Sequence, residues 1–166
     1  QMCIRDRSGS HSLSVENIAN RCLEEGFEII YIHSRSFNNF DKLIKFKENI
    51  FKEAPHIFGM VSELEEETNQ NLVNFANDIS LVNLLQMGVP IGKGGQKFSW
   101  YAADRIEDFN LNCSTVSNIE LDGGLTIDII KKLKKGVVNR LAGWSIISDS
   151  NPRNVLSKAY EVEKVL

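Results

Sequence analysis

Apolar residues along the chain follow two spacings, which predict alternating helices and strands. Helical spacing, with apolar residues three or four positions apart, predicts helices over residues 14–26, 38–55, 64–78, 99–110, 126–136 and 151–166. Short continuous apolar runs predict strands over residues 27–33, 56–62, 79–87, 117–122 and 139–147. The pattern therefore predicts five strands, each followed by a helix.

Capping and breaking residues stand where these helices should begin and end. Ser14 is placed to cap the first helix, and Gly26 to end it. Pro55 ends the second helix. Asn151 and Pro152 are typical of the start of the last one.

Strict alternation of strand and helix predicts a parallel sheet, because parallel neighbours need crossover connections. The strands are continuous apolar runs, as expected when both faces of a sheet are covered. Two α/β architectures fit this pattern. One is the open doubly wound sheet, of which five units would make a flavodoxin-like domain, and the other is the closed (β/α)8 barrel.

The composition and charge of the chain are typical of a globular protein and limit the classes of function that it could have. The chain has 166 residues, of which 42% are hydrophobic and 25% charged, with a net charge of −3. We expect one globular domain with neither a membrane span nor a nucleic-acid surface. Cys22 and Cys113 have no metal-ligand spacing and predict buried thiols in a reducing cytoplasm.

The first seven residues, QMCIRDR, lack the apolar core of a signal peptide. They resemble a translated sequencing adapter of the kind found in environmental DNA. We therefore leave residues 1–7 out of the predicted fold and assign residues 8–166 to the domain.

Three predicted strands end in glycine-containing segments. These are MGVPIGKGGQKF at residues 87–98, DGGL at 122–125 and LAGWS at 141–145. Glycine lets backbone N–H groups approach an anion closely, and a helix capped by Thr126 would add a partial positive charge. Taken alone, the segment after Asp122 is better explained as a strand-to-helix turn, with the aspartate as a local capping residue. The three segments in sequence order favour a phosphate site.

The first of these segments resembles the loop after the sixth strand of ribulose-phosphate 3-epimerases. That loop reads Met, Ser or Thr, Val, Asn, Pro, Gly, Phe, Gly, Gly, Gln, any residue, Phe. The residues that match it in register are Met87, Val89, Gly92, Gly94, Gly95, Gln96 and Phe98. Residues 119–147 resemble the following strands of the family, which end in Val-Asp-Gly-Gly and Ala-Gly-Ser.

Upstream, residues 27–33 resemble the family's fourth strand, whose final histidine matches His33. Residues 10–17, SHSLSVEN, resemble the end of its third strand, where a histidine matching His11 is a metal ligand. The resemblance thus implies a TIM barrel of the ribulose-phosphate-binding type, present as a C-terminal fragment of about five β-α units. The His-x-Asp segment of the family's second strand, which holds the second catalytic aspartate, has no counterpart here, so we expect the fragment to be inactive by itself.

The resemblance implies a cytoplasmic 3-epimerase of the pentose phosphate pathway that interconverts D-ribulose 5-phosphate and D-xylulose 5-phosphate. Such an enzyme uses one divalent metal ion (Zn, Fe, Mn or Co) and is expected to form a homo-oligomer. Asp122 is then an acid/base group and a metal ligand, and His11 is a second ligand. The loop over residues 87–98 becomes a lid. The residues expected to bind the phosphorylated ketose are Gly92, Lys93, Gly94, Gly95, Gly123, Gly124, Gly143 and Trp144.

Several residues depart from the family pattern. Pro90, Ile91 and Lys93 replace Asn, Pro and Phe of the lid, and Lys93 could either meet the phosphate or point to solvent. Trp144 replaces a small serine, and Arg35 replaces a glutamate. Two alternatives stay open. One is another barrel enzyme of keto-sugar phosphates, such as a decarboxylase, an aldolase or an allulose-phosphate epimerase, and the other is a non-catalytic flavodoxin-like phosphate-binding domain.

Other polar and aromatic residues have simpler expected roles. His33 closes an apolar strand and His56 begins one, so we expect both to be structural. The acidic run 63–67 predicts a solvated helix start. Trp100 and Tyr101 open a helix and are expected to pack against the barrel wall.

Overall fold

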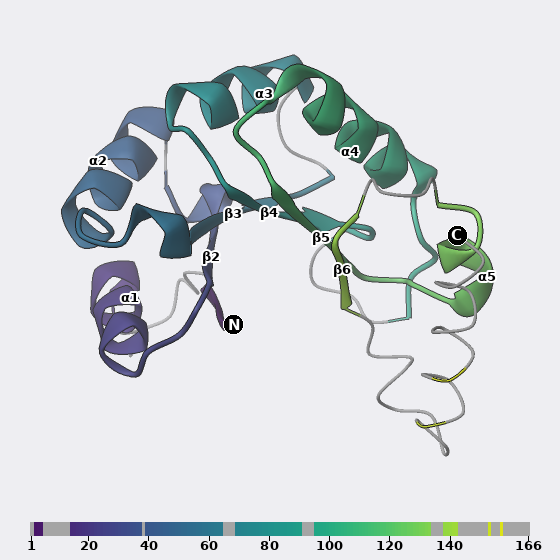
Figure 1. The fold of residues 1–166 in the computed structure, drawn as a ribbon, viewed down its shortest axis with the longest axis horizontal. Coiled ribbons are helices and arrows are strands. Elements are labelled where there is room, and N and C mark those ends of the chain that lie inside the picture. Colours follow the sequence, from purple (N-terminus) through teal and green to yellow (C-terminus); the bar gives the residue numbers. More distant parts are fainter. Residues whose placement is uncertain are drawn as a thin grey trace.

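The fold is a sheet of parallel strands with helices on its outer side (Figure 1). It is seen in a computed structural model that describes residues 2–4, 14–37, 39–64, 69–90, 95–133, 138–142, 153 and 157. The strands are β1 (Met2–Ile4), β2 (Ile30–His33), β3 (Phe58–Ser62), β4 (Asn83–Met87), β5 (Asn118–Asp122) and β6 (Arg140–Ala142). The predicted strands of the sheet are confirmed, and β2 to β5 are shorter than the apolar runs suggested.

The helices are α1 (Val15–Glu24), α2 (Phe40–Ile50), α3 (Asn69–Asp78), α4 (Trp100–Asn112) and α5 (Ile127–Ile130), with short 3-10 turns η1 (Ser34–Ser36) and η2 (Pro55–Ile57). Ser14 caps α1, because its side chain accepts a hydrogen bond of 3.2 Å from the backbone N–H of Asn17. In the part of the chain described, no helix is long and apolar enough to cross a membrane.

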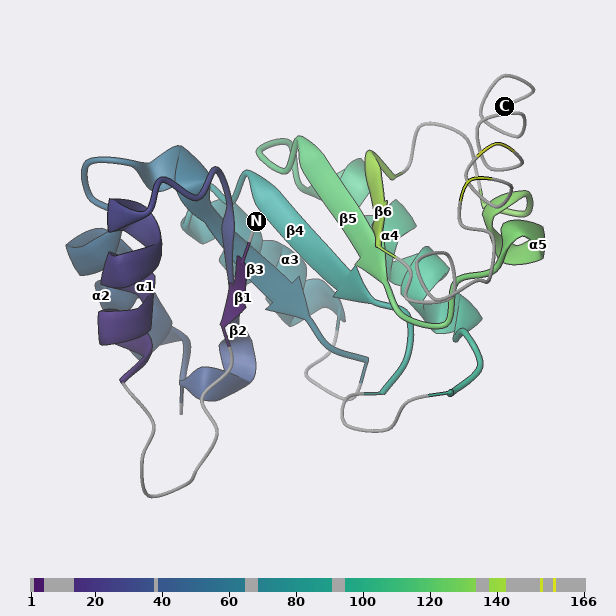
Figure 2. The ribbon, with the colours of Figure 1, turned by 90° about the horizontal axis from the view of Figure 1, so that it is seen from below.

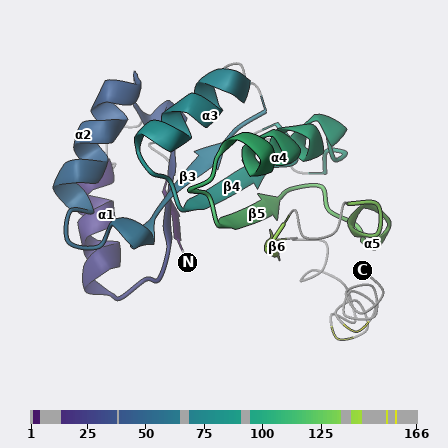
Figure 3. The same cartoon turned by 45° about the horizontal axis from the view of Figure 1, so that its top comes forward.

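The strand order decides between the two candidate architectures. The sheet runs β1-β2-β3-β4-β5-β6, so every strand pairs in parallel with the one before it in sequence. A doubly wound sheet would need a reversal of that order. Figures 2 and 3 show α2, α3 and α4 together on one side of the strands, as a barrel requires. The predicted partial TIM barrel is confirmed.

The two faces of the sheet carry two separate apolar clusters. On the helix side, alternate strand residues such as Ile32, Met60 and Leu84 pack with the helices in the main core. On the opposite, inner face a smaller cluster consists of Ile29, Tyr31, Val61 and Leu85, with Met87 packed against it. Burial on both faces explains why the strands are continuous apolar runs in the sequence.

Strand β1 was not predicted, because it falls within residues 1–7, which the sequence analysis left out of the fold. Met2–Ile4 pairs in parallel with Ile30–Ile32 of β2, so the backbone of this segment occupies the edge of the sheet. The adapter-like origin of residues 1–7 stays a prediction.

Candidate active site

The candidate site lies where β4, β5 and β6 end. Asp122, the last residue of β5, pairs in register with Met87 of β4 and Ala142 of β6. The three glycine-containing segments predicted from the sequence therefore follow three neighbouring strands. In a parallel barrel, the carboxyl ends of the strands form the face on which ligands bind.

The base of the loop after β4 is closed by backbone hydrogen bonds. The N–H of Gly88 donates to the carbonyl oxygen of Asp122 at 2.6 Å, and the N–H of Ser99 donates to the carbonyl oxygen of Gly88 at 2.8 Å. Within the loop, the side-chain amide of Gln96 donates to the carbonyl oxygen of Pro90 at 3.0 Å. The loop thus leaves β4 and returns to α4 at one point, directly beside Asp122.

The turn after Asp122 requires glycine. Gly123 and Gly124 have φ angles of +99° and +68°. A Cβ on Gly124 would lie 2.8 Å from the backbone nitrogen of Phe98, and one on Gly88 would lie 2.5 Å from the carbonyl oxygen of Gly123. The loop and the turn approach each other so closely that side chains at these positions would separate them.

Asp122 has the electrostatic environment of an acid/base group. Its side chain is half-buried, and this burial raises the pKa of the carboxyl group. A hydrogen bond from the backbone N–H of Gly123 lowers that pKa, and the nearby Glu120 raises it further. A carboxyl group with a raised pKa at the end of a barrel strand is a candidate for proton transfer.

Several predicted ligand-binding residues lie outside the described residues. These are His11, Gly92, Lys93, Gly94, Gly143 and Trp144. Gly95 is described and exposed, with a φ of +74°. Gly123 and Gly124 are described beside Asp122. The phosphate-binding role of all these residues stays a prediction.

The expected metal centre is not made up by the described residues. Asp122 is in place as one candidate ligand, but among the described residues no group of three His, Cys, Asp or Glu side chains could hold a metal ion. A divalent metal usually needs at least three protein ligands. The described residues alone therefore do not make up a metal site, and Asp122 and His11 stay its predicted ligands.

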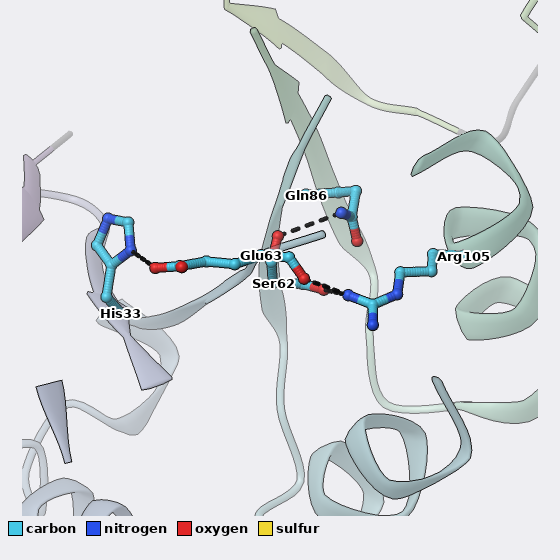
Figure 4. Close-up of polar contacts among 5 residues, drawn as sticks. All are labelled: His33, Ser62, Glu63, Gln86 and Arg105. Atoms are coloured by element: carbon cyan, nitrogen blue, oxygen red, sulfur yellow. Dashed lines mark hydrogen bonds and ion pairs between the residues drawn. The ribbon is translucent and has the colours of Figure 1, made fainter. Parts of the chain in front are cut away.

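A buried histidine and carboxylate lie on the other side of the same face. Nδ1 of His33 lies 2.6 Å from Oε1 of Glu63, with side-chain exposures of 7% and 2% (Figure 4). The expectation that Glu63 begins a solvated helix is wrong, because Glu63 follows β3 directly and its side chain is buried against His33. The sequence gives one signal that was missed: Glu63 comes immediately after a buried strand.

An arginine from the helix layer holds the end of β3. The guanidinium group of Arg105, in α4, donates through Nη1 to the carbonyl oxygen of Glu63 and, at 3.3 Å, to Oγ of Ser62. The side-chain amide of Gln86 donates to the carbonyl oxygen of Ser62 at 3.2 Å. Figure 4 shows Glu63 extending toward His33 while Arg105 approaches from the opposite side. No periodic pattern in the sequence distinguishes Arg105 from a surface arginine.

The aromatic residues at the start of α4 do not pack as expected. Trp100 and Tyr101 are 46% and 47% exposed, so the prediction that they pack against the barrel wall is wrong. Trp100 contacts the ring of Phe98 edge-on, and the Tyr101 ring lies 5.1 Å from the guanidinium carbon of Arg105.

The model of the ribulose-phosphate 3 epimerase family matches residues 13–147, which is most of the chain. The chain belongs to the ribulose-phosphate 3 epimerase family. The match includes the loop after β4, the turn after Asp122 and the His33–Glu63 pair.

Solved structures show the same fold at low sequence identity. KGPDC from Streptococcus mutans, solved in complex with D-R5P, is 13% identical with a TM-score of 0.64, over 90% of this chain and 66% of that one. A 3-hexulose-6-phosphate synthase is 12% identical with a TM-score of 0.65, over 89% of this chain and 67% of that one. The 3-keto-L-gulonate-6-phosphate decarboxylase from Vibrio cholerae O1 biovar El Tor str. N16961 is 10% identical with a TM-score of 0.62, over 90% and 67%.

This member of the ribulose-phosphate 3 epimerase family thus spans about two-thirds of the length of these barrel structures. No curated protein matches its sequence.

Proposed function

We propose that the protein acts on a phosphorylated ketose, and that its reaction is the interconversion of D-ribulose 5-phosphate and D-xylulose 5-phosphate. The observation that carries the proposal is the half-buried Asp122, whose pKa is raised by burial, at the base of a glycine-rich loop. Membership of the epimerase family supports the choice of substrate.

Asp122 would begin the reaction as a base. Its carboxylate takes the proton from the carbon next to the ketone, and the electron pair of the broken C–H bond forms the C=C bond of an enediolate. The π electrons of the ketone move to its oxygen. Return of a proton to the other face of the carbon gives the epimer. A raised pKa brings the carboxyl group closer to the operating pH, which favours transfer in both directions.

The loop and the turn after Asp122 would place the phosphate. The backbone of Gly124 lies against that of Phe98, so the turn and the end of the loop form one surface beside the acid. Backbone N–H groups in such glycine segments can point at an anion without a lysine. We propose that the phosphate is held by this surface together with Gly143 and Trp144 after β6. The resemblance to the family implies that a divalent metal held by Asp122 and His11 would act as a Lewis acid and stabilise the enediolate.

The test measures hydrogen exchange at carbon 3. Because the resemblance implies that this chain is inactive by itself, D-ribulose 5-phosphate is incubated in D2O with a protein in which the family's second-strand segment precedes this chain. Loss of the carbon 3 proton is followed by NMR. We expect exchange with the unaltered protein and a loss of at least about 100-fold in Asp122→Asn. Asp104→Asn is the matched control, because Asp104 is an exposed aspartate on α4. Equal exchange by the two variants would contradict the role of Asp122.

A second reaction is favoured by the fold neighbours, two of which are a synthase and a decarboxylase. Decarboxylation of a keto-sugar acid phosphate also passes through an enediolate. Release of CO2 from 3-keto-L-gulonate 6-phosphate, without exchange in D-ribulose 5-phosphate, would replace the epimerase by that reaction. We further propose that the protein is a homo-oligomer, which light scattering would test.

A further inference from the structure

We propose that Gln96 is a positioning residue for phosphate binding, because its side chain joins the two arms of the loop after β4 beside Asp122. The first arm consists of residues 88–90, and the second arm of residues 96–99. The inference rests on the proposed function, in which the turn after Asp122 and the end of this loop hold the phosphate. It assigns to one side chain the positioning of that surface.

Backbone hydrogen bonds fix the base of both arms. The N–H of Gly88 donates to the carbonyl oxygen of Asp122 at 2.6 Å, and the N–H of Ser99 donates to the carbonyl oxygen of Gly88 at 2.8 Å. These bonds determine where the arms leave the sheet. Each residue beyond the base adds two rotatable backbone angles, so the base alone does not determine where the arms lie over the turn.

Residues of both arms pack against the glycine turn after β5. A Cβ on Gly123 would lie 2.6 Å from Cγ2 of Val89, so the first arm contacts the turn. A Cβ on Gly124 would lie 2.8 Å from the backbone nitrogen of Phe98, so the second arm contacts it as well. Both arms thus touch the same turn, and backbone N–H groups in such a turn can point at an anion.

Gln96 joins the arms a second time, beyond these contacts. Its Nε2 donates to the carbonyl oxygen of Pro90 at 3.0 Å, a contact that we call the Gln96–Pro90 clasp. Both residues are partly buried, and a hydrogen bond shielded from water is stronger than one at the surface. Proline has a fixed φ, so the accepting carbonyl belongs to a stiff arm. Val89 and Phe98 lie between the base and the clasp, which therefore holds them in their contacts with the turn.

Loss of the clasp should weaken phosphate binding without slowing proton transfer. The phosphate does not react, so contacts with it stabilise the bound substrate and the transition state alike. Asp122 is held by the pairing of β5 with Met87 of β4 and Ala142 of β6, and not by the clasp. A variant without the clasp should therefore raise KM and leave kcat nearly unchanged.

The experiment compares two glutamines that each donate one hydrogen bond. The rate of carbon 3 exchange is measured over a series of D-ribulose 5-phosphate concentrations, with the same protein as in the exchange assay, to give kcat and KM. Gln96→Met keeps the length of the side chain and removes the donor. We expect KM to rise about 10-fold and kcat to stay within about twofold. Gln70→Met is the matched control and should change neither constant, because Gln70 donates to Oδ1 of Asn74 at 2.9 Å on the exposed surface of α3.

Cleavage by trypsin after Lys93 gives a second readout, which does not depend on activity. Lys93 stands between the two arms in the sequence. Cleavage in a folded protein follows the population in which the cleaved segment is open, so Gln96→Met should be cut there about 10-fold faster than Gln70→Met. Equal cleavage of the two variants would show that the clasp does not join the arms, and would overturn the inference.

The kinetic outcomes distinguish the inference from the proposed function. An unchanged KM in Gln96→Met overturns the inference while the proposed function stands. A loss in kcat as large as the loss in kcat/KM also overturns it, because the effect of Gln96 would then lie in the chemical step. Thermal unfolding checks that the variants fold, and Gln96→Ala serves if Gln96→Met does not. Absence of exchange by the unaltered protein overturns the proposed function, and the inference with it.

Discussion

Replacing Gly124 by alanine tests the close contact between the glycine turn and the loop after β4. Gly124 has a φ of +68°, and its Cβ would lie 2.8 Å from the backbone nitrogen of Phe98 and 2.8 Å from Cγ1 of Val89. A left-handed φ costs alanine about 1 to 2 kcal/mol, part of which is offset because alanine stiffens the unfolded chain. Forcing a methyl group into a filled space costs about 1 to 3 kcal/mol more.

We therefore expect Gly124→Ala to lower the free energy of unfolding by about 2 to 4 kcal/mol. The backbone of Phe98 cannot rotate away as a flexible side chain could, so the loop must shift as a whole. The assay is urea unfolding followed by circular dichroism, with the slope of the transition checked so that only the midpoint differs between variants.

Two other glycines separate backbone strain from steric contact. Gly26 and Gly95 have φ angles of +76° and +74°, and a Cβ on either would meet nothing within 4 Å. Gly26→Ala and Gly95→Ala should each cost only about 1 kcal/mol. If Gly124→Ala were no more destabilising than these controls, the turn and the loop would not be in the contact described, and the proposed phosphate surface would lose its basis.

Three further predictions concern single side chains. Because burial raises the pKa of Asp122, its ionisation costs the folded state stability, and this cost grows as the pH rises from the ordinary aspartate range through the raised pKa. Asp122→Asn should therefore raise the melting temperature at pH 7 but not at pH 3, and an equal effect at both would contradict the pKa direction. Asn83→Leu removes donors to the carbonyl oxygens of His56 and Phe58 and an acceptor for Asn118, so urea unfolding should show a loss of about 2 to 4 kcal/mol; a neutral effect would contradict these bonds. Arg105→Met should lose about 2 to 3 kcal/mol by the same measurement because the carbonyl oxygen of Glu63 loses its donor, with Arg105→Lys between it and the unaltered chain; a lysine variant as unstable as the methionine variant would contradict this order.

The fold was predictable because its local signals agree with one another. The apolar runs are continuous since β2, β3 and β4 are covered on both faces, by the helices on one side and by the inner cluster on the other. Ser14 caps the start of α1 and Gly26 follows its end with a positive φ, as their residue types predict. What periodicity could not supply is the order of the strands, because a barrel and a doubly wound sheet share the same alternation of elements. Only the pairing of each strand with its predecessor distinguishes them.

Only the part of the site that depends on local residue types was predictable from the sequence. Glycines that must adopt a positive φ or admit a close neighbour are visible as residue types, so the turn after Asp122 could be located. Glu63 could not, because it begins an acidic run that resembles a helix start. Its burial depends on His33, thirty residues earlier in the chain, and on Arg105 in α4. Such a contact between distant residues leaves no periodic signal.

The inner face of the sheet changes from apolar to ionisable side chains toward the carboxyl ends of the strands. Toward their middle, β2, β3 and β4 present Tyr31, Val61 and Leu85 to the interior, where these side chains pack together. His33 pairs in register with Val61, and Glu63 and Asp122 stand at the carboxyl ends of β3 and β5. Burying ionisable groups is costly unless they are paired, which explains why the buried side chains of His33 and Glu63 lie in contact. Ionisable groups thus stand at the carboxyl ends of β2, β3 and β5, the ends at which ligands bind in a parallel barrel.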